Sequence, residues 1–255
     1  MARLILKAIN SFLNFVVMLS LCVTGIYAGY ALWDNNQVYA AAENVQADMI
    51  KMKPVMGGDG EEGASFEELL AVNPDVCAWV TVDNTHIDFP ILQGETNLTY
   101  INRDVYGNFA LAGSIFLDSR NDAGFHDLVS LLYGHHMEEG DMFGDLDLFK
   151  DQKFFEENKT GLLILPDRAY DLEIFACMLV EASEEAIFDP HEYEADINKL
   201  LELTGQSAMY YDADKVAKLR ETSGENQILL LSTCSAEFTD ARTIVLAEMK
   251  PHSGR

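Results

Sequence analysis

Short apolar runs separated by turn-forming residues dominate the chain from Val76 to Lys250. The runs are rich in β-branched and aromatic residues and are too short for typical helices. They fall at residues 78–82, 113–117, 128–133, 161–165, 172–180, 227–231 and 243–247. Short, evenly spaced strands favour a closed or nearly closed barrel, because full closure removes exposed strand edges. The sequence therefore predicts a mainly β domain.

Helical spacing interrupts this pattern mainly between residues 191 and 222. Apolar residues repeat at helical spacing from Ile197, and Gly205 follows them as the predicted C-terminal cap. Asp212 is the predicted N-cap of a second helix. A further helical piece is expected at about 146–158. The periodicity therefore predicts a mainly β domain with helical insertions.

The N-terminal segment contains no charged residue from Ala8 to Trp33, which is long enough to cross a bilayer as a helix. Arg3 and Lys7 precede it and acidic residues follow, so the positive-inside bias keeps the N-terminus cytoplasmic and exports the rest. The alternative is a cleaved signal peptide with small residues at 40–42. Signal peptides have shorter apolar cores, which favours a retained membrane anchor.

Turn formers and a capping signal divide the remaining chain. A helical segment and then a glycine- and acid-rich stretch follow the apolar run, which indicates a tether. Ser65 and Glu68 form a capping-box pair, so the folded domain is expected to begin near Ser65. The predicted parts are a cytoplasmic stub and transmembrane anchor at 1–33, a helical and flexible tether at 34–64, and a folded domain at 65–255.

Charge and cysteine content exclude several classes of function. The formal net charge is −25, so the chain lacks the basic surface that nucleic-acid binding requires. The same negative charge opposes docking onto anionic lipid headgroups. The 4 cysteines include no C-x-x-C pair that would indicate a metal or redox site. Cys77 and Cys177 lie in strand-like runs and are expected to be small buried apolar residues, with a structural disulfide as the alternative.

Two strings about a hundred residues apart carry the candidate chemistry. One ends an apolar run in Gly134-His135-His136, and the other ends a run in Ser232-Thr233-Cys234 with Arg242 further on. A thiol, an imidazole and a guanidinium are sufficient for covalent acyl transfer through sulfur. The order His, Cys, Arg does not fit papain-like enzymes, and the residues around Cys234 do not fit the caspase signature.

With these strings the chain resembles the class B sortases. The family pattern is a Gly-His near mid-chain, a Thr-Leu-x-Thr-Cys string that ends a strand, and an Arg shortly after it. The string here begins with Leu230 where the family has Thr. Further segments resemble the family and occur in the same order, at residues 73–75, 79–80, 87–90, 93–94, 113–118 and 142–146. The resemblance therefore covers roughly residues 66–250.

The resemblance implies an eight-stranded β-barrel with helical insertions, beside the N-terminal transmembrane helix. It also implies that Cys234 is the nucleophile, that His135 holds and later donates the proton, and that Arg242 stabilises the oxyanion or clamps the substrate. His135 is selected because it directly follows the glycine, which leaves His136 a structural or rim position. By the same resemblance, Asn97 and Tyr133 could line a site for an extended peptide, together with Ser232 two residues before Cys234.

The expected activity is that of a membrane-bound cysteine transpeptidase with its catalytic domain outside the cell. It would cleave a C-terminal LPxTG-like or NPxTN-like signal of an exported protein, hold the product as a thioester and transfer it to an amine of the cell-wall peptidoglycan. A pilin lysine is the alternative acceptor. If water were the acceptor, the enzyme would be a simple cysteine peptidase. A non-catalytic sortase-fold protein that binds envelope partners is a further alternative. No metal or organic cofactor is expected, because the His135–His136 pair has no further ligand at a suitable spacing.

Overall fold

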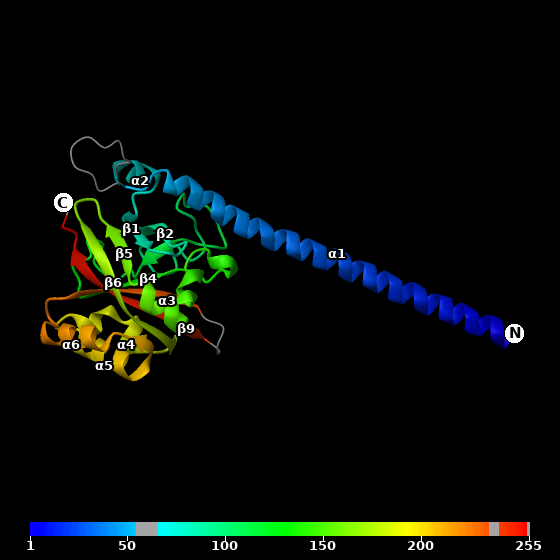
Figure 1. The fold of residues 1–255 in the computed structure, drawn as a ribbon. Coiled ribbons are helices and arrows are strands. Elements are labelled where there is room, and N and C mark those ends of the chain that lie inside the picture. The colour runs from blue at the N-terminus through cyan, green and yellow to red at the C-terminus, as the bar shows by residue number, and fades with distance from the viewer. Residues whose placement is uncertain (55–65, 235–239, 254–255) are drawn as a thin grey trace. The chain divides into compact units, whose positions relative to one another are not determined.

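The computed structural model describes residues 1–54, 66–234 and 240–253 (Figure 1). The chain divides into two compact units, Met1–Ala41 and Ala42–Arg255. A single helix, α1 (Ala2–Ile50), makes up the first unit and continues into the second. Because α1 is unbroken across residue 33, the predicted anchor and the predicted tether helix are one element. The three-part division of the chain stays a prediction.

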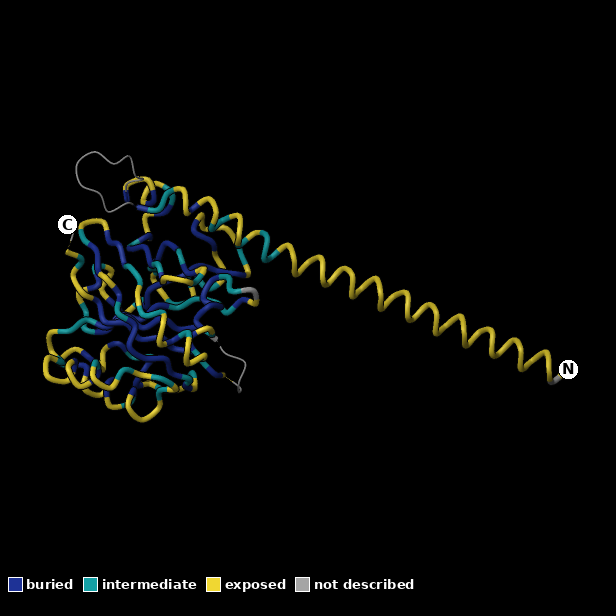
Figure 2. The backbone as a smooth tube through the Cα atoms, viewed as in Figure 1, coloured by how far each residue is buried: buried dark blue, intermediate teal, exposed yellow. Residues whose placement is uncertain are grey.

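The first unit has the character of a membrane-spanning segment. Within the described residues, one helix is long and apolar enough to cross a bilayer; it lies at Arg3–Ile50 and its mean hydropathy reaches 1.9. Its large apolar side chains, such as Phe12 and Leu21, are exposed. Figure 2 colours the backbone of this helix yellow, the colour of exposed residues, over most of its length. An isolated apolar helix of this length is compatible with lipid as its surroundings.

The second unit is built on a closed β-barrel. Eight strands follow one another around it in the order β5-β1-β2-β3-β4-β8-β9-β6, and β5 pairs with β6 to close the ring. The ninth strand, β7, pairs with a later part of β6 than β5 does. Closure confirms the predicted eight-stranded barrel. The strand bounds are β1 (Val76–Val82), β2 (Asp88–Leu92), β3 (Ile115–Leu117), β4 (Val129–Tyr133), β5 (Thr160–Ile164), β6 (Ala169–Glu181), β7 (Ala208–Tyr211), β8 (Gln227–Cys234) and β9 (Ala241–Pro251).

Two of the strand pairs are parallel, β2 with β3 and β4 with β8, and the others are antiparallel. The β4–β8 pair matters most for function. Parallel strands end at the same edge of a sheet, so the residues that follow β4 meet those that end β8. These strands are apolar on both faces because one face lines the barrel interior and the other is covered by helices.

Short helices connect the strands. Their bounds are α2 (Phe66–Val72), η1 (Glu138–Gly140), η2 (Gly144–Lys150), α3 (Gln152–Glu157), α4 (Glu185–Phe188), η3 (Pro190–Tyr193), α5 (Asn198–Ser207) and α6 (Ala213–Glu221). The predicted cap of α6 is confirmed, since the Asp212 side chain accepts a hydrogen bond from the backbone N–H of Lys215. Ser65, the first residue of the predicted capping box, lies outside the described residues.

The predicted cap at Gly205 is wrong. Gly205 lies inside α5, which continues to Ser207 and has Ala208 as its C-cap. The chain leaves the helix in an extended conformation to form β7, so no left-handed residue is required there. Gly205 is tolerated in the last turn because the side on which it lies is open to solvent.

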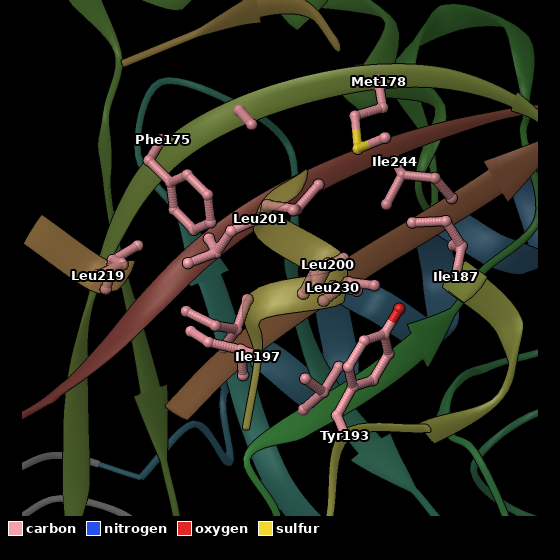
Figure 3. Packing of buried hydrophobic residues seen from close by; sticks show 14 of the residues in the cluster. Phe175, Met178, Ile187, Tyr193, Ile197, Leu200, Leu201, Leu219, Leu230 and Ile244 are labelled. Carbon is pink, nitrogen blue, oxygen red and sulfur yellow. The ribbon is translucent and has the colours of Figure 1, made fainter. Parts of the chain in front are cut away.

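Helices α4, η3, α5 and α6 cover the outer face of β4, β8, β9 and β6 with a tightly packed apolar core. Figure 3 shows Ile187 of α4 and Tyr193 of η3 on this core, over Leu230 of β8 and Ile244 of β9. The insertion between β6 and β8 is therefore a structural layer of the domain, held on the strands that carry the candidate active-site residues.

Candidate active site

The backbone brings His135 and Cys234 to the same end of two neighbouring parallel strands. The β4–β8 register runs from Val129↔Ile228 to Tyr133↔Ser232. Beyond the last pair, the Gly134 N–H donates to the Ser232 carbonyl oxygen over 3.1 Å, so the pairing extends to the Gly-His turn. Extending this register by two residues past Tyr133 predicts that His135 lies opposite Cys234, since neighbouring strands are about 4.8 Å apart.

Arg242 is on the next strand. Cys234 and Arg242 are the last pair of the antiparallel β8–β9 ladder and lie directly opposite each other. Cys234 and Arg242 are thus paired in neighbouring strands, and His135 follows the end of the strand on the other side of β8. The side chain of Cys234 and residues 235–239 are outside the described part of the chain.

The ring of His135 is held by a main-chain contact. Its Nε2 lies 2.7 Å from the Ile101 carbonyl oxygen, and the His135 carbonyl oxygen accepts from the Phe143 N–H. A carbonyl can only accept, so Nε2 carries the hydrogen in this bond. In the neutral ring Nδ1 is then the nitrogen that can take a proton.

The neighbouring His136 is tied to a different group. Its Nε2 lies 3.0 Å from Asp147 Oδ2, and Oδ1 of the same carboxylate accepts from the Thr243 hydroxyl over 3.0 Å. His136 is half-buried in this contact. This contact is compatible with the structural or rim position predicted for His136, which stays a prediction.

The guanidinium of Arg242 donates to the carbonyl oxygen of Ala241 over 2.9 Å and is half-buried. Among the described residues no carboxylate pairs with it. An arginine at a strand end without such a partner can donate to an oxyanion or to a substrate carbonyl.

The predicted peptide-binding residues divide into two groups. Ser232 is buried opposite Tyr133, and its hydroxyl has no hydrogen-bond partner among the residues that the structure describes. Asn97 and Tyr133 both donate to Oδ2 of Asp118, over 2.9 and 3.0 Å. The structure therefore joins Asn97 to Tyr133 through a residue that the sequence-based prediction of the site omitted.

Asp118 is wholly buried. The sequence of residues 118–122 is typical of a solvated acidic loop, and for Asp118 that interpretation is wrong because its carboxylate is enclosed by hydrogen-bonding partners. Burial alone would raise the pKa of this carboxyl, but hydrogen bonds from Arg120 and Asn97 more than offset that effect and hold the pKa below its usual range. Burial also raises the pKa of the Tyr133 hydroxyl, and the negative charge of Asp118 adds to this. Tyr133 therefore stays protonated and acts as a donor.

Among the described residues, no group of three or more His, Cys, Asp and Glu side chains is arranged to hold a metal ion. The chemistry available at this end of the barrel is that of a thiol, an imidazole and a guanidinium, which together suit acyl transfer through sulfur.

Comparisons with known proteins agree with this arrangement. The sortase domain family matches residues 80–250. Sortase B of Listeria monocytogenes is 31% identical over 237 residues, which cover 90% of this chain and 92% of the Listeria protein. Sortase B of Staphylococcus aureus is 29% identical over 187 residues, which cover 72% of this chain and 74% of that protein.

Solved structures give the same result. A class B sortase of Streptococcus pyogenes involved in pilus biogenesis has a TM-score of 0.66 at 38% identity and covers 74% of this chain and 100% of the solved one. The Staphylococcus aureus sortase B–substrate complex has a TM-score of 0.64 at 28% identity, with coverages of 74% and 85%.

A closed barrel with a strand-end cysteine, histidine and arginine defines a cysteine transpeptidase of the sortase type. This chain belongs to the sortase family, and its relatives place it in class B. The predicted family, fold and enzyme class are thereby confirmed.

Proposed function

We propose that this sortase cleaves exported proteins within a C-terminal LPxTG-like or NPxTN-like signal, after the Thr, and joins the new carboxyl end to an amine of the cell-wall peptidoglycan. The observation that carries the proposal is the backbone convergence of His135, Cys234 and Arg242 across three adjacent strands. Cys234 is the nucleophile, His135 the acid and base, and Arg242 the oxyanion donor.

In the first half-reaction the Cys234 thiolate attacks the Thr carbonyl carbon of the signal. The negative charge that develops on the carbonyl oxygen is stabilised by the Arg242 guanidinium. The C–N bond then breaks, and His135 gives its proton to the departing amine, which leaves a thioester on Cys234.

In the second half-reaction the acceptor amine attacks the thioester carbonyl. His135, now neutral, accepts the proton that the amine loses, and the thiolate of Cys234 departs. One peptide bond is broken and one is formed, so the overall exchange needs no external energy source. The hydrogen bond between His135 and the Ile101 carbonyl keeps the ring in one orientation through both steps.

A pilin lysine is the second candidate acceptor. Two of the similar solved structures, the Streptococcus pyogenes enzyme and a Streptococcus pneumoniae sortase B from a type II pilus, belong to pilus systems by their descriptions. Incubating the acylated enzyme with an equimolar mixture of a peptidoglycan-type stem peptide and a lysine-bearing pilin would decide between the two acceptors.

The third part of the proposal is the location. Sortases are cell-surface enzymes, and α1 is a candidate anchor. We infer that α1 spans the cell membrane once, with the N-terminus in the cytoplasm and the catalytic domain outside, because Arg3 and Lys7 precede the apolar run.

Mass spectrometry of the full chain in detergent, after incubation with a sorting peptide, tests the nucleophile. The wild-type chain should gain the mass of the acyl fragment, and Cys234→Ala should not. Cys77→Ala is the matched control and should be acylated like the wild type. An acyl adduct that persists in Cys234→Ala contradicts the assignment.

A further inference from the structure

The turn after β3 contains an ion pair that is anchored inside the domain. Asp118 is wholly buried, and Arg120 donates to both of its carboxylate oxygens, from Nε to Oδ1 over 2.9 Å and from Nη2 to Oδ2 over 2.8 Å. The Arg120 backbone N–H also donates to Oδ1. Such a two-pronged contact fixes the plane of the guanidinium as well as its position.

On one side, this ion pair holds the proposed peptide-binding residues. Asn97 and Tyr133 donate to Oδ2 of Asp118, and Oδ1 of Asn97 accepts from the Ser119 N–H over 2.7 Å. The side chains of Asn97 and Tyr133 therefore have their polar ends set by the Asp118 carboxylate.

On the other side, the same guanidinium reaches the β6–β7 insertion. Arg120 Nη2 donates to the Phe188 carbonyl oxygen over 2.5 Å, and Nη1 lies 3.4 Å from Asp189 Oδ1. Phe188 is the last residue of α4, and its ring stacks on Tyr133 with 6.5 Å between ring centroids. Arg120 thus closes a ring of contacts through Asp118, Tyr133 and Phe188.

The C-terminal end of α4 leads directly into η3, whose Pro190 and Tyr193 are buried. Among the described residues, Arg120 makes the polar side-chain contact to the last carbonyl of α4. The helix has four residues, its N-cap Glu184 makes no side-chain capping bond, and Ala186 and Ile187 are its buried residues. A helix this short has little stability of its own and takes its position from tertiary contacts. Ile187 fixes the helix to the apolar core (Figure 3), whereas the Arg120 contact fixes its carbonyl end beside Tyr133.

We propose that Arg120 is a positioning residue that clasps α4 to Tyr133 and Asn97, and so sets the affinity of this enzyme for its sorting peptide. The clasp is the set Asp118, Arg120, Phe188 and Asp189. This inference rests on the proposed function, because it assigns the peptide to Asn97 and Tyr133. Lysine cannot replace the arginine, since only a planar fork spans the carboxylate and the carbonyl together.

Hydrogen exchange tests the clasp without any activity measurement. The amide N–H groups of Ile187, Phe188 and Asp189 bond to the carbonyls of Glu184 and Glu185 and report on the local opening of α4. In Arg120→Lys, measured on the full chain in detergent, these amides should exchange about tenfold faster than in the wild type. The amides of α6 should not change.

Arg168→Lys is the matched control. Arg168 also donates to a carbonyl oxygen, that of Gly124, and pairs with the adjacent Asp167, but it does not contact α4. Its substitution should leave exchange at residues 187–189 at the wild-type rate. Unchanged exchange there in Arg120→Lys would show that the clasp does not hold α4 and would overturn the proposal.

Kinetics tests the consequence for the peptide. Arg120→Lys should raise KM for the sorting peptide about tenfold while kcat stays near the wild-type value. Alkylation of Cys234 by iodoacetamide, which needs no peptide site, should keep its rate. An unchanged KM, or a parallel fall of kcat and of the alkylation rate, contradicts the positioning role.

A double variant covers the case in which Arg120→Lys does not fold. Asp118→Asn with Arg120→Gln removes both charges, so no carboxylate is left buried without its partner. It should show the same faster exchange and higher KM, and wild-type behaviour in both measurements would overturn the proposal. If the wild-type chain forms no thioester, the proposed function fails, whereas the exchange result still decides on the clasp.

Discussion

At the residue scale, desolvation is expected to lower the reactivity of Cys77, a half-buried cysteine in β1 of the barrel. Cys77 has its sulfur 3.5 Å from the Ile91 carbonyl oxygen, and removal from water raises the pKa of its thiol to about 12. At pH 8 only about one thiol in ten thousand is then ionised, and the thiolate is the reactive form.

This predicts selective labelling. Iodoacetamide at pH 8, followed by peptide mapping, should modify Cys234 and leave Cys77 unmodified, and labelling of Cys77 should rise only as the pH approaches 12. Cys234→Ala is the control for assignment of the adduct. Rapid modification of Cys77 at pH 8 would show that its thiol is more accessible than this structure allows.

Two buried tyrosines differ in whether their hydroxyls are satisfied. The Tyr193 hydroxyl lies in the apolar core under α4 without a partner, whereas the Tyr100 hydroxyl donates to Asp75 over 2.6 Å and accepts from Asn73 over 3.0 Å. A buried polar group without a partner costs free energy that a bonded one does not.

We therefore expect opposite effects on the free energy of unfolding. Tyr193→Phe should either leave the free energy of unfolding unchanged or raise it by up to about 1 kcal/mol. Tyr100→Phe should lower it by about 1–2 kcal/mol. Urea titration of both variants measures this. A clear loss of stability in Tyr193→Phe would mean that its hydroxyl has a partner in solution.

At the element scale, helix η2 ties together the two segments that carry His135 and Arg242. Asp147 of η2 contacts His136 and Thr243, the immediate neighbours of those residues, and its Oδ1 also lies 2.8 Å from Lys150 Nζ. Small displacements of reacting groups lower catalytic rates strongly.

Asp147→Asn should therefore lower kcat/KM about 10- to 100-fold. Asp151→Asn is the control, because Asp151 caps the adjacent helix α3 through the Phe154 N–H and does not contact these segments. Steady-state transpeptidation by both variants is the measurement. Equal activity in Asp147→Asn and Asp151→Asn would show that the contacts of Asp147 do not position the active-site residues.

The cap of α6 makes a prediction about pH. The hydrogen bond from the Lys215 backbone N–H, with support from Lys159, holds the pKa of Asp212 below its ordinary value. A lowered folded-state pKa means that this contribution to stability is complete above the unfolded-state pKa and is lost as the pH falls through the folded-state value.

Asp212→Ala should thus cost about 1 kcal/mol at pH 7, as is usual for a lost N-cap. The difference from the wild type should shrink as the pH falls below about 4. Denaturation at several pH values measures it. Asp214→Ala is the control, because Asp214 lies in the first turn of α6 and is not its N-cap. A loss of stability in Asp212→Ala that does not change with pH would contradict the capping role.

At the scale of the whole molecule, the two units should be separable. The barrel is complete within residues 76–251 and owes none of its strands to the first unit. A chain that lacks residues 1–33 should therefore be soluble without detergent and should keep the kcat/KM of the full chain within about threefold.

The full chain should be found with the membrane, and protease added to intact cells should digest the catalytic domain. Digestion only after cell lysis would reverse the proposed orientation. A truncated chain that aggregates would show that the helix has a folding role in addition to anchoring.

Local patterns were sufficient to predict most of the barrel strands. The predicted runs correspond to β1, β4, β5, β6, β8, β9 and, with an early start, β3. β2 and β7 were not among the predicted runs: β2 contains Asp88 and Pro90, which weaken a strand signal, and β7 has four residues whose side chains are alternately half-buried and exposed. The Gly205 error arose because a glycine near a helix end is a cap only if the chain turns left-handed there, and this chain continues into a strand.

The candidate catalytic residues were predicted from their strings, whereas their support was not. Asp118 and Arg120 read as a polar loop because nothing nearby in the sequence shows that Asn97, Tyr133 and Phe188 will meet them. The same holds for Asp147, which contacts Thr243 96 positions away. Hydrogen bonds of this kind depend on where the chain returns, and residue patterns carry no record of that.

The amino-acid sequence by itself determined the apolar N-terminal segment, the strand-rich domain and the choice of the three candidate catalytic side chains, because these follow from local composition and from a family pattern. Only the tertiary structure decided that β4 and β8 run parallel, that Cys234 is paired with Arg242 in the β8–β9 ladder, and that Asp118 is buried and paired with Arg120. The physical reason is that strand pairing and burial are set by contacts between distant segments, whose free energy exists only once the barrel has closed.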